Sequence, residues 1–486
     1  MPRYPAHFIG LVLVASLFVT ACGGGSDSDP GGAETPDSSP VGRLNILLIV
    51  ADDLGPQLGT YGDHQARTPH IDQLAAAGVT FEQAYVTQAS CSSSRSSILT
   101  GLYPMQNGQL GLAGTLPEYQ IKPGIATLPA LLQKAGYYTG ILGKLHVGPD
   151  SAFPFNYEWA SSNDAMASRD VARVARLADE FLNQAGNKPF FLYVNLFDPH
   201  RPFDENANSF LGIPEEVRSS EDVQPFPYLG LDGQLIREEI AAYYNAISRL
   251  DTGVGKLLEL LSRRDLEDDT LVIFLGDHGP PFTRAKTTSY EAGVRIPLIV
   301  NWPGEGIDGL RSSALVSTVD LLPTVLDAVG LEAPAVAGSS LRNLMWDSPP
   351  ATWREWLFTE YTSHAKAHFY PRRSVRGEQF KLIQNLDAGR PNPIPYEGRT
   401  NPRNAEVVND AAVLAYRTHE FPPPFELYDL RSDPHELLNL ADDPAHAVTL
   451  SELQTLLQQW REEMGDPLLN PAELNRLRSA HGMADP

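Results

Sequence analysis

The stretch Asn45-Ile46-Leu47-Leu48-Ile49-Val50-Ala51-Asp52-Asp53-Leu54-Gly55 decides how the chain folds. The run from Ile46 to Val50 is continuously apolar, which predicts a strand buried on both faces of a sheet. Asp52 and Asp53 follow at its carboxyl end, where ligands bind in open α/β sheets. Two adjacent carboxylates repel each other unless a cation neutralises them. Taken alone, however, the pair is better explained as a turn that ends at Gly55.

Further apolar runs of β-type composition follow along the chain at Tyr138–Leu142, Phe190–Leu196, Leu271–Leu275 and Ile296–Trp302. Helical patterns lie between them, notably at Ile236–Leu261 and Val319–Val329. Strands that alternate with helices indicate an α/β fold in which helices cover both faces of a large, mostly parallel central sheet.

The pattern changes after about Pro350. Short strand-like runs and one helix appear among loops rich in proline and arginine, at Trp356–Tyr361, Phe380–Ile383, Glu426–Leu430 and Leu450–Met464. We therefore expect a larger domain over residues 44–350 and a smaller α+β subdomain over residues 351–486. The smaller one is predicted to contain a short antiparallel sheet.

A second group of candidate metal ligands follows the strand-like run Leu271–Leu275. It comprises Asp277, which offers a carboxylate, and His278, which offers a nitrogen ligand or a hydrogen bond. The carboxyl ends of parallel strands meet at one edge of a sheet, so three carboxylates from two strands are predicted to meet there. Such a cluster suits Ca²⁺, or Mg²⁺ as the alternative, because both ions prefer oxygen ligands.

The segment Ser90-Cys91-Ser92-Ser93-Ser94-Arg95-Ser96-Ser97-Ile98-Leu99-Thr100-Gly101 reads as a loop that enters a helix. Cys91 would then lie at the helix N-terminus, where the helix dipole favours negative charge. Arg95 comes one turn later and can point to the same place. A serine-rich cap beside a buried cysteine is the alternative interpretation.

Four basic side chains follow predicted strands: Lys144, His146, His200 and Lys286. Lys144 and His146 alternate, so they face the same way on an extended segment. Single lysines and histidines usually belong to the solvated surface, and only their positions after strands make these four candidates for a site. The net charge of −23 argues against a nucleic-acid partner, because phosphate binding requires a basic surface.

The N-terminus is predicted to be an export signal. The apolar run Phe8–Val19 is short for a membrane span and has the length of a signal core. It is followed by Val19-Thr20-Ala21-Cys22, a pattern similar to a bacterial lipoprotein cleavage site. We expect residues 1–21 to be the signal peptide, Cys22 to be lipidated and residues 22–43 to be a flexible tether. An ordinary secretory signal is the alternative.

Anchoring at Cys22 would place the mature protein in the outer membrane, facing the periplasm or the surface, because the next residue is Gly23 and not aspartate. The chain has two cysteines, so lipidation of Cys22 leaves Cys91 without an intramolecular partner. An unpaired thiol in an exported protein calls for a functional explanation.

Cys91-x-Ser93-x-Arg95 with Leu99-Thr100-Gly101 downstream resembles the signature of the type I sulfatases. Residues 91–112 and 189–203, together with HFYPRRSVR and KLIQNLD, are similar to segments of the sulfamidase, or heparan N-sulfatase, branch. The resemblance implies an alkaline-phosphatase-like sandwich. It also implies that Cys91 is oxidised to formylglycine (3-oxoalanine) by a formylglycine-generating or an anaerobic sulfatase-maturing enzyme. Ser93 departs from the usual maturation pattern, which has proline or alanine there.

The same resemblance assigns roles to the charged positions. The metal ligands would be Cys91 with the following four residues: Asp52, Asp53, Asp277 and His278. His278 is commonly asparagine in the family. Five residues would surround the sulfate: Arg95, Lys144, His146, His200 and Lys286. His200 would protonate the leaving atom, and His146 would act as the base that completes turnover. The sulfamidases have arginine at the position of Lys286.

The resulting hypothesis is a sulfatase that acts on sulfated oligosaccharides or polysaccharides, such as ulvan or glycosaminoglycan. Four residues of the smaller subdomain are candidate sugar contacts: His364, Tyr370, Arg372 and Arg373. Three alternatives stay open. They are an N-sulfoglucosamine sulfohydrolase, a phosphoester hydrolase of the same superfamily, and a non-catalytic glycan-binding lipoprotein.

Overall fold

In the computed structural model, strand β1 (Asn45–Ala51) lies inside a sheet and is buried along its whole length. It pairs in parallel with β5 (Phe190–Leu196) on one side and with β7 (Thr270–Gly276) on the other. The structure describes residues 43–160, 165–203, 217–347, 350, 352–394 and 406–483. The strand predicted from the opening stretch is therefore confirmed, and it is flanked by two others that the sequence also predicts.

The central sheet has nine strands in the order β10-β2-β9-β7-β1-β5-β3-β4, with β8 paired to β2. The remaining strands are β10 (Arg311–Ser317), β2 (Val79–Tyr85), β9 (Leu298–Asn301), β3 (Tyr138–Leu142), β4 (Tyr157–Trp159) and β8 (Arg295–Ile296). Most pairs are parallel, as predicted. The single strand predicted for Ile296–Trp302 is wrong, because the chain forms β8 and β9 on either side of Pro297, and both pair antiparallel with β2. Proline has no N–H to offer a ladder.

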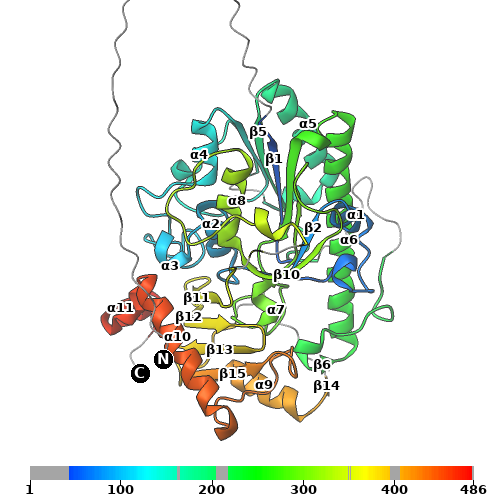
Figure 1. The fold of residues 1–486 in the computed structure, drawn as a ribbon. Helices are drawn as coiled ribbons and strands as arrows, with labels where there is room; N and C mark the ends of the chain where they lie inside the picture. The colour runs from blue at the N-terminus through cyan, green and yellow to red at the C-terminus, as the bar shows by residue number, and fades with distance from the viewer. Residues whose placement is uncertain are drawn as a thin grey trace, which may run out of the picture. The chain divides into compact units, whose positions relative to one another are not determined.

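Alternating residues of β1 face two different apolar layers. Ile46, Leu48 and Val50 pack with one set of helices, namely α2 (Cys91–Thr100), α4 (Leu128–Lys134) and α8 (Leu321–Ala328). Leu47 and Ile49 pack with the other set, namely α1 (Pro69–Ala76), α5 (Val171–Ala185) and α6 (Gln234–Arg263). Helices thus cover both faces of the sheet, as predicted (Figure 1). The alternation follows from the two-residue period of a strand.

The C-terminal part forms a second, four-stranded antiparallel sheet in the order β11-β12-β13-β15. Its strands are β11 (Leu357–Ser363), β12 (Phe369–Arg376), β13 (Phe380–Asn385) and β15 (Phe425–Asp429). Helix α10 (Ala447–Glu463) packs on this sheet through Leu453, Leu457 and Trp460 (Figure 1). The predicted short antiparallel sheet and the helix near Leu450–Met464 are confirmed, whereas β12 was not anticipated.

Other short elements include α3 (Pro104–Asn107), α7 (Glu291–Val294), α9 (Asp410–Glu420), α11 (Pro471–Ala480), β6 (Leu231–Asp232) and β14 (Glu406–Val407). Several short 3-10 helices connect them, among them Ala165–Arg169. The predicted signal peptide, the lipidated Cys22 and residues 22–42 of the tether lie outside the described residues. Within the described ranges, no helix has the length and apolar character needed to cross a bilayer. The domain boundary at residue 350 stays a prediction.

Candidate active site

Three buried carboxylates meet at the carboxyl edge of the central sheet. Asp52 and Asp53 follow β1, and Asp277 follows β7, which is the parallel neighbour of β1. The backbone N–H of Asp53 donates to Oδ1 of Asp277 across 2.9 Å. All three side chains are fully buried. The structure therefore brings together the three carboxylates that the sequence places after separate strands.

A tyrosine that sequence reasoning missed holds the turn of Asp53. Asp53 has a φ of 64°, a left-handed backbone conformation that is unusual for residues other than glycine. The hydroxyl of Tyr243, on α6, donates to the carbonyl of Asp53 at 3.1 Å and accepts from the N–H of Gly55 at 3.3 Å. These two hydrogen bonds fix the backbone on both sides of Leu54.

Each carboxylate is paired with a basic side chain. Nζ of Lys144 lies 2.7 Å from Oδ2 of Asp52, and Nζ of Lys286 lies 2.9 Å from Oδ1 of Asp53. Nε of Arg95 donates to Oδ2 of Asp277 at 3.0 Å. Three of the predicted cations thus contact the predicted metal ligands directly, and all six side chains are buried.

The charges affect the three carboxyl groups differently. Burial raises the pKa of Asp52 and of Asp53, but nearby positive charge outweighs burial and the pKa of each is lowered. Lys144 is the main cause for Asp52, and His200 with Lys286 for Asp53. For Asp277, burial and the charge of Asp52 raise the pKa. The pKa is lowered for two carboxyl groups and raised for the third because three like charges in one site repel one another.

Cys91 is the first residue of α2, and its thiol is buried. Its Sγ lies 3.4 Å from Nε2 of His278. The same nitrogen is 3.3 Å from Oδ1 of Asp53 and 3.8 Å from Oδ1 of Asp277. Burial lowers the pKa of His278, but Asp277, Cys91 and Asp53 outweigh burial and raise it to about 9. The imidazole nitrogen therefore points into the carboxylate cluster.

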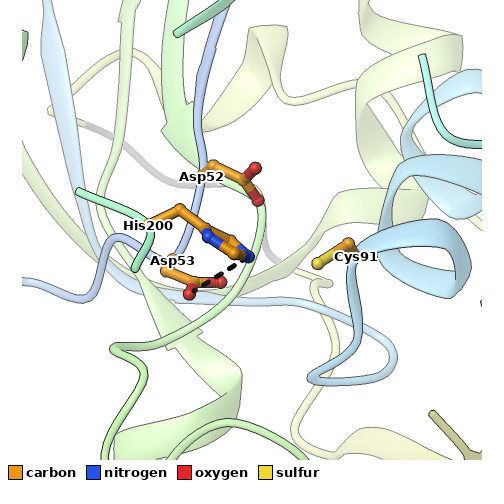
Figure 2. Close-up of side chains that lie close together, drawn as sticks. All are labelled: Asp52, Asp53, Cys91 and His200. Atoms are coloured by element: carbon orange, nitrogen blue, oxygen red, sulfur yellow. Dashed lines mark ion pairs between the residues drawn. The ribbon is translucent and has the colours of Figure 1, made fainter. Parts of the chain in front are cut away.

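The residues present fit a divalent cation. Two overlapping groups offer ligand atoms that lie within 4.8 Å of one another: Asp52, Asp53, Cys91 and His200 in one, and Cys91, Asp277 and His278 in the other. In Figure 2, the side chain of Cys91 faces Asp52, Asp53 and His200 from the start of α2. Oδ1 of Asp52 is buried and has no hydrogen-bond partner within the described part of the chain. Hard oxygen donors together with imidazole nitrogen suit such an ion.

Two histidines flank the cluster. Nε2 of His200 lies 3.8 Å from Oδ2 of Asp53 (Figure 2). The same nitrogen is 3.3 Å from Nζ of Lys286. Burial lowers the pKa of His200, and Asp53 opposes that effect in part. Burial and the charge of Lys144 hold the pKa of His146 well below its usual value. Its Nδ1 is buried without a hydrogen-bond partner among the residues that the structure describes.

The structure brings three of the four candidate sugar contacts towards the loops of the site. Nδ1 of His364 lies 2.9 Å from Oγ of Ser90, the residue before Cys91. Arg372 donates to the carbonyl of Thr287, the residue after Lys286, at 3.0 Å. The guanidinium of Arg372 lies 4.7 Å from the ring centre of Tyr370.

Arg373 lies elsewhere. It is fully buried, and Nε and Nη2 bind both oxygens of Asp466 at 2.9 and 2.8 Å. Nη2 is also 3.7 Å from Glu360. Neighbouring residues of a strand face opposite sides of the sheet, so Arg373 points away from Arg372 and towards the layer of α10. The structure does not bring Arg373 to the cluster.

Asn195 is a further residue that sequence reasoning missed. It lies inside the buried strand β5, and its Oδ1 accepts a short hydrogen bond from Nη1 of Arg95. The same Nη1 lies 3.2 Å from the carbonyl oxygen of Lys144. A polar residue within the apolar run Phe190–Leu196 is the signal that could have revealed Asn195, because a buried amide must find partners.

The chain matches the family described as Sulfatase over residues 44–331, and the family described as N-sulphoglucosamine sulphohydrolase, C-terminal, over residues 276–410. It is 36% identical over 455 residues to N-sulphoglucosamine sulphohydrolase of Homo sapiens, covering 87% of this chain and 91% of that protein. An ulvan-active sulfatase of Formosa agariphila is 27% identical, with 88% of this chain and 81% of the relative covered.

Solved structures share the architecture. One protein, in complex with its substrate D-glucosamine-2-N,6-O-disulfate, gives a TM-score of 0.66 at 22% identity, covering 87% of this chain and 99% of that chain. The phosphonate monoester hydrolase of Agrobacterium radiobacter gives 0.64 at 21% identity, covering 87% and 96%. At such identities the likeness shows the fold alone.

The fold is the alkaline-phosphatase-like sandwich that the sequence predicts, with a large central sheet and a small antiparallel one. The chain belongs to the sulfatase family and resembles its sulfamidase branch, as the two family matches and the human relative show. It is accordingly a sulfuric ester hydrolase. The predictions of family, fold class and enzyme class are confirmed.

Proposed function

We propose that the protein removes sulfate groups from sulfated carbohydrate. The observation that carries this proposal is the position of Cys91, at the start of α2 with its sulfur 3.4 Å from Nε2 of His278. Asp53 and Asp277 lie around that same nitrogen. Relatives named for N-sulphoglucosamine and for ulvan support a saccharide as the substrate.

Two groups complete the proposed site. Formylglycine formed from Cys91 would supply, in its hydrated form, the hydroxyl that attacks sulfur. A divalent ion would supply positive charge for the sulfuryl oxygens, and Ca²⁺ is our first choice, with Mg²⁺ as the alternative. Its ligands would be Cys91, as formylglycine, together with Asp52, Asp53, Asp277 and His278. A metal analysis of the purified protein tests this choice.

The chain's own residues then bind the sulfate and move protons. Lys144 and Lys286 offset negative charge on the sulfuryl oxygens, and Arg95 keeps Asp277 in place. His200 donates a proton from Nε2 to the leaving oxygen or nitrogen, since its Nδ1 faces the carbonyl of Arg201. A lowered pKa makes the protonated ring a stronger acid. His146 is proposed as the base that releases sulfate.

We further propose N-sulfoglucosamine as the first substrate to test. The match to the C-terminal family of N-sulphoglucosamine sulphohydrolases spans residues 276–410 and so includes His364 and Arg372. These side chains approach the loops of Cys91 and Lys286 from the second sheet. An O-sulfated sugar is the second candidate.

The test measures sulfate release by ion chromatography. The protein, co-expressed with a sulfatase-maturing enzyme, is incubated with N-sulfoglucosamine, O-sulfated glycosaminoglycan disaccharides and ulvan fragments, and with the Cys91→Ala variant as the control. We expect release by the wild type only. Parallel assays with aryl phosphate and phosphonate esters distinguish a phosphoester hydrolase from a sulfatase. Binding of the sulfated saccharides without any release of sulfate would support a non-catalytic glycan-binding protein.

We also propose that Cys22 is lipidated and that it anchors the exported protein in the outer membrane. The proposal rests on the Val19-Thr20-Ala21-Cys22 pattern. Labelling with an alkyne fatty acid, followed by membrane fractionation, tests it. The wild type is expected in the labelled membrane fraction and Cys22→Ser outside it; an unlabelled wild type would contradict the anchor.

A further inference from the structure

The loop that carries His200 begins with a buried carboxylate bound by two arginines. Oδ1 of Asp198 accepts from Nε of Arg169 at 3.0 Å, and Oδ2 accepts from Nε of Arg249 at 2.9 Å. All three side chains are almost completely buried. Two buried guanidinium groups on one carboxylate carry a large desolvation cost. Fold stability alone is a weak explanation for them.

Arg169 does more than pair with Asp198. Its Nη2 donates to the carbonyl of His200 at 2.6 Å and also to the carbonyl of Pro202. One guanidinium group therefore binds the backbone at His200 and two residues beyond it. Arg169 ends the short helix Ala165–Arg169, so it reaches this loop from a separate part of the chain.

Arg169 also contacts Phe197, the aromatic residue that packs against the ring of His200. Its guanidinium carbon lies 4.6 Å from the ring centre of Phe197, and the rings of Phe197 and His200 are 4.7 Å apart. The histidine Nδ1 faces the carbonyl of Arg201, which leaves Nε2 directed at Lys286 and Asp53. The direction of Nε2 thus depends on a backbone that Arg169 holds at two carbonyl groups.

We propose that Arg169 is a positioning residue for His200, acting through Asp198 and through the carbonyls of His200 and Pro202. The inference rests on the proposed function, in which His200 protonates the leaving atom. A displacement of about 1 Å in a catalytic group costs about a hundredfold in rate. A lysine at position 169 keeps the charge but loses the planar fork that binds the carboxylate and the carbonyls together.

The kinetic test compares two leaving groups. Arg169→Lys is expected to lower kcat for N-sulfoglucosamine by about 10- to 100-fold with KM changed by less than about twofold. For 4-nitrophenyl sulfate, whose leaving group needs no proton, the loss should stay below about threefold. In a His200→Ala background, Arg169→Lys should have no further effect. Arg173→Lys, at an exposed arginine of the following helix α5, is the matched control.

A second measurement does not depend on turnover. In protein labelled with ¹³C at histidine Cε1, the His200 resonance is assigned by its loss in His200→Gln. It should shift or broaden in Arg169→Lys and stay unchanged in Arg173→Lys. If Arg169→Lys does not fold, Asp198→Asn undergoes the same two measurements.

The outcomes separate this inference from the proposed function. Equal losses for both leaving groups, additive effects with His200→Ala, or an unchanged His200 resonance would each overturn the role of Arg169. A wild type that releases no sulfate contradicts the proposed function, and the resonance then still decides whether Arg169 positions His200.

Discussion

Nε2 of His278 lies 3.4 Å from Sγ of Cys91 and points into the carboxylate cluster. Type I sulfatases commonly have asparagine at this position, which offers an amide oxygen. An imidazole nitrogen is a softer donor than an amide oxygen, and imidazole suits first-row transition metals better than Ca²⁺. His278 is therefore the residue that can make the metal preference of this site differ from that of sulfatases with asparagine at this position.

His278→Asn should shift metal preference towards Ca²⁺. We expect the affinity for Mn²⁺ relative to Ca²⁺ to fall by about tenfold, within the range that altered metal environments show. Isothermal titration with each ion, on protein stripped with a chelator, measures the ratio. An unchanged ratio would mean that the His278 nitrogen does not bind the metal.

Tyr243→Phe should weaken metal binding without touching a ligand. The lost hydroxyl leaves the carbonyl of Asp53 and the N–H of Gly55 unpaired, at a cost of about 1–3 kcal/mol in unfolding free energy. Tyr244→Phe is the matched control, because its hydroxyl binds Asp63 instead. Both variants should be destabilised in urea, and only Tyr243→Phe should lower metal affinity. Equal metal affinities would contradict the role of Tyr243.

The stretch Asn45–Gly55 made two residues of the site, Asp52 and Asp53, predictable from the sequence. An apolar strand followed by Asp52 and Asp53 needs only local periodicity, and Asp277 follows from the rule that parallel strands end at one edge. Residues whose partners are remote in sequence could not be found in this way. Arg169 gives no local signal, since its partners Asp198 and His200 lie about thirty positions away.

Strand β12 is a second element that could not be predicted because its partners are remote in sequence. Phe369–Arg376 contains a proline and three arginines, yet the whole strand is buried. Two of its arginines are neutralised by distant residues, Arg373 by Asp466 and Arg376 by Glu291. A sequence pattern cannot reveal that compensation, because buried charge is normally evidence against a core strand.

Arg372 and Arg373 should therefore respond differently to substitution. Arg372→Ala is expected to raise KM for the saccharide and to cost less stability than Arg373→Ala, because Arg372 donates to the carbonyl of Thr287 and to the side-chain amide of Asn385, so its loss leaves no buried charge unpaired. Arg373→Ala leaves Asp466 buried without this partner and should cost about 3–5 kcal/mol in unfolding free energy. Urea unfolding and steady-state kinetics on N-sulfoglucosamine separate the two effects. A raised KM in folded Arg373→Ala alone would reverse the assignment.

Asp466 should make stability depend on acid pH. Burial raises its pKa, but Arg373 and Arg461 outweigh burial and lower it to about 2, below the ordinary value of 3.8. Because the folded-state pKa is depressed, the stabilisation is complete above about pH 4 and is lost as the pH falls towards 2. It amounts to about 2 kcal/mol. Urea unfolding of wild type and Asp466→Asn between pH 5 and 2.5 measures it, and parallel curves would exclude Asp466 as the cause.

Ser93 bears on whether Cys91 is oxidised. It is the third residue of α2, where the first helical backbone bond runs from Ser94 to Ser90, so a proline at position 93 removes no hydrogen bond of the helix. Its hydroxyl is buried, with no hydrogen-bond partner in the part of the chain that the structure describes. Ser93→Pro should therefore fold with a stability within about 1 kcal/mol of the wild type.

The Ser93→Pro variant restores the usual maturation pattern. After co-expression with a maturing enzyme, mass spectrometry of the Cys91 peptide should show formylglycine in both proteins, with a larger fraction in Ser93→Pro. Formylglycine in the variant alone would mean that Ser93 blocks maturation, and an intact thiol in both would remove the proposed nucleophile.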